Sequence, residues 1–448
     1  MISKYFLGAS ILIANLLLFS SCLNSSDNNL EYPVDPQIYA ISISSKADTT
    51  SLLTGVAFTI DQVNGKLFNK KPLPYGFHVD SVMLSITGSN SYYSFAAIEL
   101  TLEPDCTYIW LSDSIAISRL SRIKTTAPDG ITTKRYDFQL NIYQEDPYIL
   151  TWEKISGDYL NSPVEDQTTI AYKNRCYTYY RSGNEIKADS TTISDTPKWG
   201  KVDLSGIPHT LRLSSLITSG NLIYALDSAT GAVYQSSDGS DWSVLQTEYE
   251  VKALYGELPF AESGNILLAV SHDEKIKFAR ANNDLSIIVL MNDLPANLPI
   301  IDFSAMKVES ATSYASKFIF LTGGDDADGT FNSNIWILQE DGGVIKYITS
   351  KRPAEGILTG SSLFFYDEKP YLIATSTEKN ILIYSENYGI DWVKAEENQS
   401  LPTDFTERTN ASVITDANNN IWIFGGISSS NTPVVDIWKG RLNKFAMN

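Results

Sequence analysis

Two short stretches carry a serine, an acidic or amide residue, a glycine and a tryptophan in nearly the same order. They are SSDGSDW at 236–242 and SENYGIDW at 385–392. Such a set could mark a catalytic site, and the chemistry would then be glycoside hydrolysis. It could equally build a tight turn, because Asp and Asn side chains accept hydrogen bonds from the backbone of their own turn.

Both stretches resemble the Asp-box of sialidases, Ser-x-Asp-x-Gly-x-x-Trp. The first is one residue short, and the second has Asn387 in place of Asp. The resemblance implies an outer hairpin turn, away from any catalytic face, with Trp242 and Trp392 packed between sheets. A sialidase also needs three arginines and a Tyr–Glu pair. The arginines after residue 148 lie outside that family's Arg-containing motif; they are Arg175, Arg181, Arg212, Arg280, Arg352, Arg408 and Arg441.

The supply of metal ligands argues against a metal or other cofactor. Histidine occurs only at 78, 209 and 272, which nearly excludes a His-based centre. The loop at 325–329, DDADG, lacks the spacing of a calcium loop, with Ile337 where the glutamate would stand, so we expect a solvated loop. Paired carboxylates for a glycosidase cannot be selected among 52 acidic residues.

The chain is acidic and has few thiols. Without residues 1–21, which contain one lysine, 33 basic residues face 52 acidic ones, a formal net charge of −19. Such a surface repels phosphate backbones and excludes nucleic acid as a partner. Cys106 and Cys176 fall in separate predicted domains, so we expect two buried free thiols; a disulfide is the alternative.

The first 32 residues predict export and lipid attachment. The apolar run at 5–19 is too short for a permanent membrane helix and marks residues 1–21 as a signal peptide. The sequence LFSSC at 18–22 resembles the bacterial lipobox, which implies a lipidated Cys22. The alternative is an ordinary secretory signal. The polar residues 22–32 predict a flexible tether.

Residues 33–147 predict a β-sandwich. Short alternating runs are separated by turn residues, and the clearest places Tyr136, Phe138 and Leu140 on one face. The sequence FTIDQVNGKLFNKKPLPYG at 58–76, followed by VDSVMLSI at 79–86, resembles the small Ig-like domains at the N-termini of Bacteroidetes surface lipoproteins. Tyr92 and Tyr93 could form a binding tip, although a packed loop pair is the commoner outcome.

Residues 148–448 contain a repeat. Six apolar runs start at 176, 221, 265, 317, 370 and 420, with spacings of 45, 44, 52, 53 and 50 residues. This period predicts a six-bladed β-propeller, with five or seven blades as alternatives.

Two of these runs end in a glycine pair and are followed by a strand with Trp, which resembles the kelch repeat. The pairs are Gly323-Gly324 and Gly425-Gly426. Glycine suits a place where strands crowd near the axis and the backbone turns sharply. A kelch propeller of the galactose oxidase type would hold copper through two His and two Tyr, one Tyr being crosslinked to a Cys, and His209, His272 and Cys176 do not fit that pattern.

The last repeat lacks its trailing strand, and a matching run, YILTWEKIS, stands at 148–156. We therefore expect residues 149–155 to pair with the strand around 436–442. Closing the ring in this way leaves no free sheet edge.

The whole mature chain resembles an uncharacterised family of Bacteroidetes lipoproteins with an Ig-like domain and a kelch or Asp-box type propeller. Our hypothesis is a lipid-anchored, non-enzymatic protein of the outer membrane that engages a glycan or an envelope protein through the propeller; whether it faces the cell surface is left open by the sequence. The alternative is a glycan-active, sialidase-like hydrolase on the same propeller.

Overall fold

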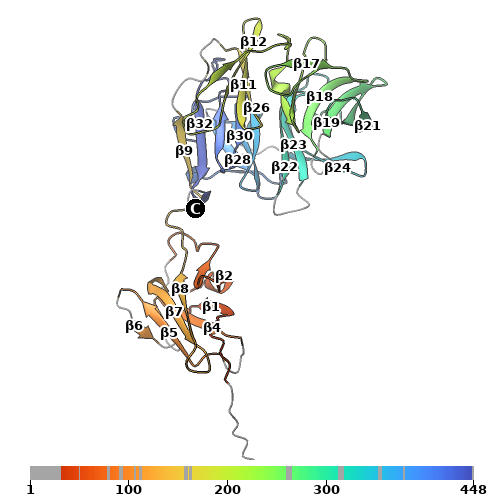
Figure 1. Ribbon diagram of the computed structural model, residues 1–448. Helices are drawn as coiled ribbons and strands as arrows, with labels where there is room; N and C mark the ends of the chain where they lie inside the picture. Colours follow the sequence, from red (N-terminus) through yellow and green to blue (C-terminus); the bar gives the residue numbers. More distant parts are fainter. Residues whose placement is uncertain are drawn as a thin grey trace, which may run out of the picture. The chain divides into compact units, whose positions relative to one another are not determined.

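The computed structural model is built from β-strands (Figure 1). It describes residues 32–49, 51–77, 81–89, 94–104, 107–109, 114–155, 160, 164–258, 265–310, 317–351, 356–376 and 379–445. Helix in these ranges is confined to the short 3₁₀ turns η2 (Leu53–Gly55), η3 (Ile117–Arg119), η4 (Leu213–Ser215), η5 (Glu397–Gln399) and η6 (Asn443–Phe445). None of the described helices is long and apolar enough to cross a membrane. The predicted all-β class is confirmed.

Several predictions fall outside the described residues. They are the signal peptide at 1–21, Cys22, nearly all of the tether at 22–32, Tyr92, Tyr93, His78, Cys106 and Arg352. Cys176 is described, and it is buried and free of any disulfide. Burial raises the pKa of its thiol to about 12, with a smaller contribution from the charge of Asp416.

The chain divides into two units between Glu145 and Asp146. The sequence placed this boundary at 147/148. Residues 146–149 belong to the second unit because their carbonyls accept hydrogen bonds from its C-terminal turn: Lys444 N donates to Pro147 O (3.1 Å) and Asn443 N to Ile149 O (3.0 Å).

The first unit consists of two sheets with a shared core. A two-stranded sheet pairs β1 (Ala40–Ser44) with β4 (Met83–Thr87). The other has the order β2 (Phe58–Asp61), β3 (Lys66–Asn69), β8 (Thr133–Gln139), β7 (Leu120–Thr126), β5 (Ala97–Leu102) and β6 (Thr107–Ile109). Both sheets contribute to one core, with Ile41, Leu84, Leu100, Ile123 and Phe138 among its members.

β3 and β7 were not predicted as strands, although each belongs to a short hairpin, β3 with β2 and β7 with β8. β3 also runs parallel to β8, a long-range pairing that no local turn indicates. The Ig-like subtype of this unit stays a prediction.

The described residues of the second unit form six four-stranded antiparallel sheets. The first sheet consists of β10 (Asp166–Tyr172), β11 (Arg175–Ser182), β12 (Glu185–Thr191) and β13 (Gly200–Val202). The second consists of β14 (Ile217–Ser219), β15 (Leu222–Leu226), β16 (Val233–Ser236) and β17 (Trp242–Leu245). The third consists of β18 (Glu250–Glu257), β19 (Ile266–His272), β20 (Lys275–Ala281) and β21 (Ile288–Asp293).

The fourth sheet consists of β22 (Ile301–Glu309), β23 (Lys317–Asp325), β24 (Asn334–Asp341) and β25 (Val344–Lys351). The fifth consists of β26 (Ile357–Tyr366), β27 (Lys369–Thr375), β28 (Asn380–Tyr384) and β29 (Val393–Lys394). The sixth is β30 (Ser412–Thr415), β31 (Ile421–Phe424), β32 (Ile437–Leu442) and β9 (Leu150–Ile155).

The first strands of the sheets form a closed ring. β10 contacts β14, β14 contacts β18, and the sequence continues through β22, β26 and β30 back to β10. This cyclic order of sheets is a β-propeller. The six apolar runs of the sequence are the second strands of the sheets, which are almost wholly buried because neighbouring sheets cover both their faces.

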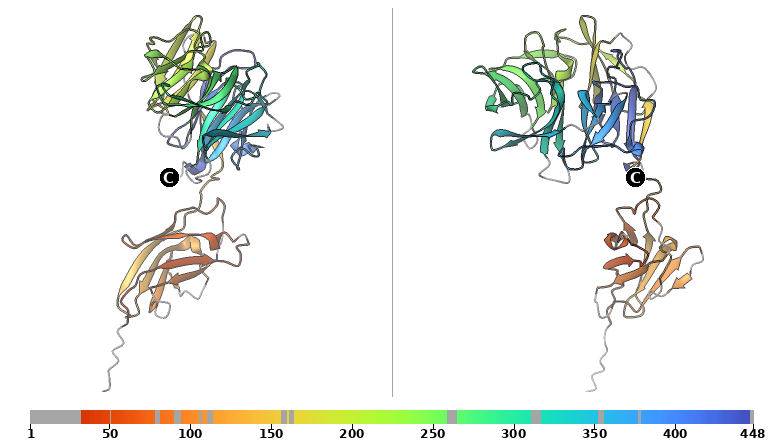
Figure 2. Two further views of the ribbon diagram at one scale, coloured as in Figure 1. Left: turned by 90° about the vertical axis from the view of Figure 1, so that its right-hand side faces the viewer. Right: turned by 180° about the vertical axis from the view of Figure 1, so that it is seen from behind.

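The two ends of this unit meet in the sixth sheet. β9 pairs antiparallel with β32, from Ile437 opposite Ile155 to Leu442 opposite Leu150. The yellow strand beside the dark blue one shows this in Figure 1 and again in Figure 2. Trp152 covers Gly440, where an added Cβ would lie 2.5 Å from the indole ring.

The glycine pairs lie at the ends of β23 and just after β31, all with positive φ. An added Cβ on Gly425 would overlap the side chain of Gln167 in the first sheet, and one on Gly323 would lie 2.7 Å from the Leu358 carbonyl oxygen in the fifth sheet. An added Cβ on Gly426 would lie 2.8 Å from Thr409 O and 3.2 Å from Arg408. Their small size thus permits close approach of backbone and neighbouring sheet.

Arg408 is a fully buried arginine between the fifth and sixth sheets. Its guanidinium pairs with the Asp436 carboxylate and donates to Gly425 O (3.1 Å) and Thr406 O (2.8 Å). Its backbone N donates to Asn380 Oδ1 (2.8 Å) in the fifth sheet. Lys154 Nζ of β9 forms an ion pair with the same Asp436 carboxylate (3.3 Å to Oδ2), so this carboxylate links the closing strand to the junction.

We expect Gly440→Ala to destabilise the propeller, because the added methyl group displaces Trp152 in the closing strand. The cost of such overpacking is about 1–3 kcal/mol. Gly200→Ala is the matched control: a Cβ there meets nothing within 4 Å, so its effect stays within about 0.5 kcal/mol. Urea unfolding followed by Trp fluorescence measures both, since seven of the eight Trp residues lie after residue 145. Equal stability of the two variants would contradict the closure by β9.

Candidate functional site

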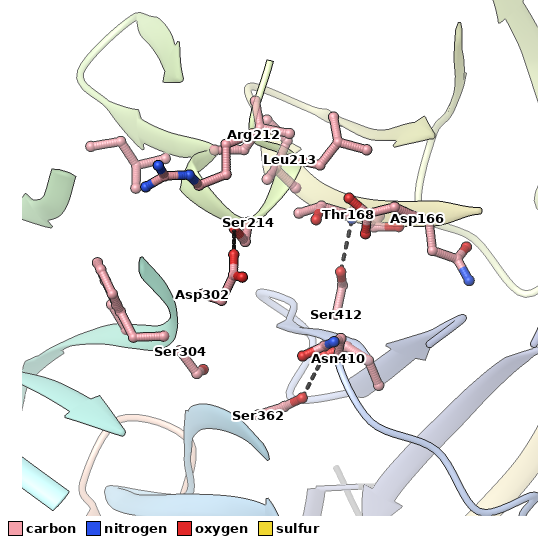
Figure 3. Close-up of a pocket in the computed structure, with 18 of the residues that line it drawn as sticks. Asp166, Thr168, Arg212, Leu213, Ser214, Asp302, Ser304, Ser362, Asn410 and Ser412 are labelled. Atoms are coloured by element: carbon pink, nitrogen blue, oxygen red, sulfur yellow. Dashed lines mark hydrogen bonds between the residues drawn. The ribbon is translucent and has the colours of Figure 1, made fainter. Parts of the chain in front are cut away.

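A polar cavity of about 680 Å³ lies where the first strands of the six sheets converge (Figure 3). Each sheet contributes to its wall: Asp166–Ile170, Leu216–Ile217, Leu254, Ile301–Ala305, Ser361–Leu363 and Asn410–Val413. Arg181, Arg212, Ser214 and Ser228 complete it. This position makes it the central channel of the propeller, where residues distant in sequence meet.

Two arginines line the channel, and of the two only Arg181 has acceptors for its guanidinium among the described residues. Arg181 donates through its guanidinium to the carbonyls of His209 and Leu211, the latter at 2.8 Å. Arg212 is half-buried, and within the described part of the chain its guanidinium has no hydrogen-bond acceptor.

The fold holds the Arg212 backbone firmly. Its N–H donates to Leu226 O (2.8 Å), and its carbonyl accepts from Ser215 through both N–H (3.1 Å) and Oγ (2.6 Å). The residue directly precedes η4, so the 3₁₀ turn fixes where the side chain leaves the wall. A positioned, unpaired guanidinium is a ready donor for a carboxylate or phosphate group.

Two carboxylates share the same channel. Asp302 is exposed, has a φ of +52°, and accepts a hydrogen bond from Ser214 Oγ (2.6 Å). A non-glycine residue in this region of φ carries backbone strain, which is often found at functional sites. Burial raises the pKa of Asp166, the positive charge of Arg181 lowers it in part, and the charge of Asp302 raises it further.

Three serines of the channel wall link neighbouring sheets. Ser304 Oγ accepts from Leu363 N (2.9 Å), Ser362 Oγ donates to Ala411 O (2.6 Å), and Ser412 Oγ accepts from Thr169 N (2.8 Å). These hydroxyls therefore hold the fourth sheet to the fifth, the fifth to the sixth and the sixth to the first. Arg212, Asp166 and Asp302 are the charged groups left facing the channel with capacity for a ligand.

Sequence reasoning did not select any of these residues. The serines carry a weak signal, because Ser-Ala-Met at 304–306, Ser-Leu-Phe at 362–364 and Ser-Val-Ile at 412–414 recur at matching places in three first strands. The charged residues carry none. Arg181, Arg212, Asp166 and Asp302 are brought together only by ring closure.

The Asp-box-like stretches lie elsewhere. The first forms the turn between β16 and β17, in which Asp238 Oδ1 accepts from the N–H groups of Ser240 (2.8 Å) and Asp241 (2.9 Å). These backbone hydrogen bonds lower the pKa of Asp238 to about 2. In the second stretch Asn387 Oδ1 accepts from Asp391 N in the same way (2.9 Å).

Each of these turns contacts the preceding sheet. Tyr179 of β11 donates its hydroxyl to Gly239 O (2.7 Å), and its ring packs edge-on against Trp242. An added Cβ on Gly389 would overlap Phe320 of β23, whose ring also faces Trp392. The stretches thus join sheets, and none of their residues lines the channel.

The sialidase arrangement is not assembled in the described residues. Of the seven arginines after residue 148, Arg181 and Arg212 reach the channel, whereas Arg408 is buried against Asp436. The described ranges also contain no group of three or more His, Cys, Asp or Glu that could hold a metal ion.

The loop at 325–329 differs from the expected solvated loop in one respect. Asp326 is buried, and its Oδ1 accepts from Asp328 N (3.0 Å) and Thr330 N (2.9 Å). The carboxylate is used to hold the turn, which accounts for an acidic residue at this position.

Comparison with protein families assigns both units. Residues 146–448 match the family described as the DUF6242 beta propeller domain, and residues 36–140 match the DUF6242 N-terminal domain, a domain of unknown function. The chain belongs to the DUF6242 family. No curated protein matches this DUF6242 chain in sequence.

Solved structures similar to the DUF6242 chain are distant. The structure of YjhT shares 12% identity, covering 62% of this chain and 94% of that one with a TM-score of 0.46. Virginiamycin B lyase from Staphylococcus aureus shares 12% identity over 66% of this chain and 99% of its own, at a TM-score of 0.39. A protein of unknown function from Bacteroides thetaiotaomicron covers 86% of this chain and 98% of its own, with 11% identity and a TM-score of 0.39.

Asp166→Asn is expected to raise the melting temperature at neutral pH. When a carboxyl has a pKa in the folded state above its unfolded pKa of about 3.9, its ionisation destabilises the folded protein. At pH 7 the ionised carboxylate therefore lowers the free energy of unfolding. The amide removes that cost, and the advantage of the variant disappears below the unfolded pKa, where wild-type Asp166 is protonated in both states. Calorimetry at several pH values measures the difference. A variant that is less stable at pH 7 would show that Asp166 is a structural carboxylate.

Proposed function

We propose that this protein is a non-enzymatic, lipid-anchored binding protein of the outer membrane whose propeller channel engages a glycan. In this account Cys22 carries the lipid, the first unit is an Ig-like spacer, and the six sheets are the blades of a kelch-like propeller. The argument for the lipid anchor is the lipobox-like sequence LFSSC at 18–22. The glycan is argued from the channel.

The observation that carries the glycan assignment is the guanidinium of Arg212, which lies in a polar channel and has no acceptor among the described residues. A cavity of about 680 Å³ has the volume of a site for a small ligand or for the end of a glycan chain. A guanidinium pairs in bidentate fashion with a carboxylate. Asp302 and Asp166 are acceptors for the hydroxyl groups of the same ligand. We therefore favour a glycan with an acidic sugar over an envelope protein.

A hydrolase is the second candidate, and Asp166 favours it. Glycosidases use a carboxylic acid of raised pKa as proton donor beside an ionised carboxylate. Burial gives Asp166 a raised pKa, and Asp302 in the same channel is close enough for its charge to raise that pKa further. In such an enzyme Asp166 would protonate the leaving oxygen and Asp302 would activate water or attack the sugar.

The two candidates are separated by screening the protein on a panel of acidic and neutral glycans for both binding and product release. We expect binding of acidic glycans without products. Arg212→Gln should weaken that binding at least about tenfold, because a charge-assisted pair contributes about 1.5–3 kcal/mol.

Arg280→Gln is the matched control. Arg280 lies on β20 and does not line the channel, so binding should be unchanged. Product release at a steady rate that is lost in Asp166→Asn would establish the hydrolase instead. Equal binding by the Arg212 and Arg280 variants would remove the basis for an acidic glycan in the channel.

A further inference from the structure

Two hairpin turns of the first unit present aliphatic side chains almost fully to solvent. Val63, between β2 and β3, is 92% exposed, and Ile131, between β7 and β8, is 82% exposed. Val34 and Tyr39 of the N-terminal segment are 66% and 57% exposed. We call these four residues the tip patch. Turns favour Gly, Asn, Asp and Ser, so two aliphatic turn residues need another reason.

Both turns are built in the same way. Asp61 Oδ1 accepts from Val63 N (3.0 Å) and Asn64 N (3.0 Å). Asp129 Oδ1 accepts from Ile131 N (2.9 Å) and Thr132 N (2.9 Å). In each case the aspartate two positions before the aliphatic residue accepts hydrogen bonds from the turn backbone, so its carboxylate is bound within the turn. The turns are therefore held rigid with an apolar side chain pointing outward.

The two turns lie on the same side of the paired strands. β3 and β8 run parallel and each follows its turn, but Lys66 pairs with Asp137, so the turn at 127–132 extends four residues further than the turn at 62–65. Contacts tie them together: Lys134 Nζ donates to Gln62 O (2.8 Å), and Tyr136 Oη donates to Gln62 Oε1 (2.7 Å).

The N-terminal segment belongs to the same side of these strands. Gln62 Nε2 donates to Ile38 O (2.5 Å), and Thr125 Oγ1 bonds the Pro36 carbonyl oxygen (2.5 Å). The chain that leads back from here to Cys22 is short. Ten residues separate Tyr32 from Cys22, a reach of at most about 35 Å.

We propose that the tip patch inserts into the lipid headgroup layer of the membrane that holds Cys22. This inference rests on the lipid anchor of the proposed function. Lys66 and Arg135 are exposed beside the turns and suit lipid phosphates. Apolar side chains in the interface add to the affinity of a lipid anchor and fix the orientation of the unit that carries it.

The test uses the full-length, lipidated protein in vesicles of phosphatidylethanolamine and phosphatidylglycerol. A polarity-sensitive fluorophore is attached at Val63→Cys or Ile131→Cys in a Cys106→Ser background, where Cys176 is buried and unreactive. The matched control is Ile287→Cys in the second unit, whose native side chain is 62% exposed. We expect brominated lipids to quench the labels at 63 and 131 about twofold or more and to leave the label at 287 unchanged.

The outcomes separate the two claims. If the protein floats with the vesicles and the labels at 63 and 131 are no more quenched than the label at 287, insertion of the tip patch is wrong and the lipid anchor stands. If the protein does not float, or if Cys22→Ala floats equally well, the lipid anchor is wrong and the insertion falls with it. Quenching at 63 and 131 that is lost in Cys22→Ala supports both.

Discussion

The propeller depends on one buried charge at the junction of its fifth and sixth sheets. Removing a guanidinium from water costs several kcal/mol unless its charge and donors are satisfied. Asp436 and the carbonyls of Gly425 and Thr406 meet this need for Arg408. Asp436 also binds Lys154 and accepts from Trp438 Nε1 (3.2 Å), so the same carboxylate fixes β32 and the closing strand β9.

The channel follows from that junction. Gly426 leaves room for Arg408, and Gly425 leaves room for Gln167 of the first sheet, whose Nε2 donates to Gly426 O (3.1 Å) and Val434 O (2.9 Å). The chain from Arg408 then enters the channel wall at Asn410 and Ser412. A ring closed at this point places Asp166, Arg212 and Asp302 around one cavity, although 136 residues separate the first from the last.

The sequence predicted the repeat better than the site. The second strands are apolar on both faces, so the runs beginning at Cys176 and Asn265 stand out by composition alone. The trailing strand absent from the last repeat pointed to residues 149–155, where β9 lies. The first strands were not recognised, because their channel-facing residues are polar and interrupt the alternation.

Nothing local distinguishes the residues of the channel and the buried junction. The residues next to Arg408 in the sequence do not distinguish it from a surface arginine, yet it is among the largest fully buried side chains. Asp166 and Asp302 are two of 52 acidic residues, and only the closed ring brings them together. The Asp-box-like stretches were predicted to be turns from their turn chemistry alone, and they form turns outside the channel lining.

A double-mutant cycle on Arg408 and Asp436 tests most directly whether this pair organises the ring. Unfolding in urea is followed by Trp fluorescence for Arg408→Met, Asp436→Leu and the double variant. Asp436→Leu leaves the buried Arg408 guanidinium without its counter-charge and should cost about 3–5 kcal/mol. Arg408→Met should cost less, because the Asp436 carboxylate keeps Lys154 and Trp438 as partners. The double change should recover part of the larger loss. A small loss in Asp436→Leu, or single losses that simply add in the double variant, would contradict the account.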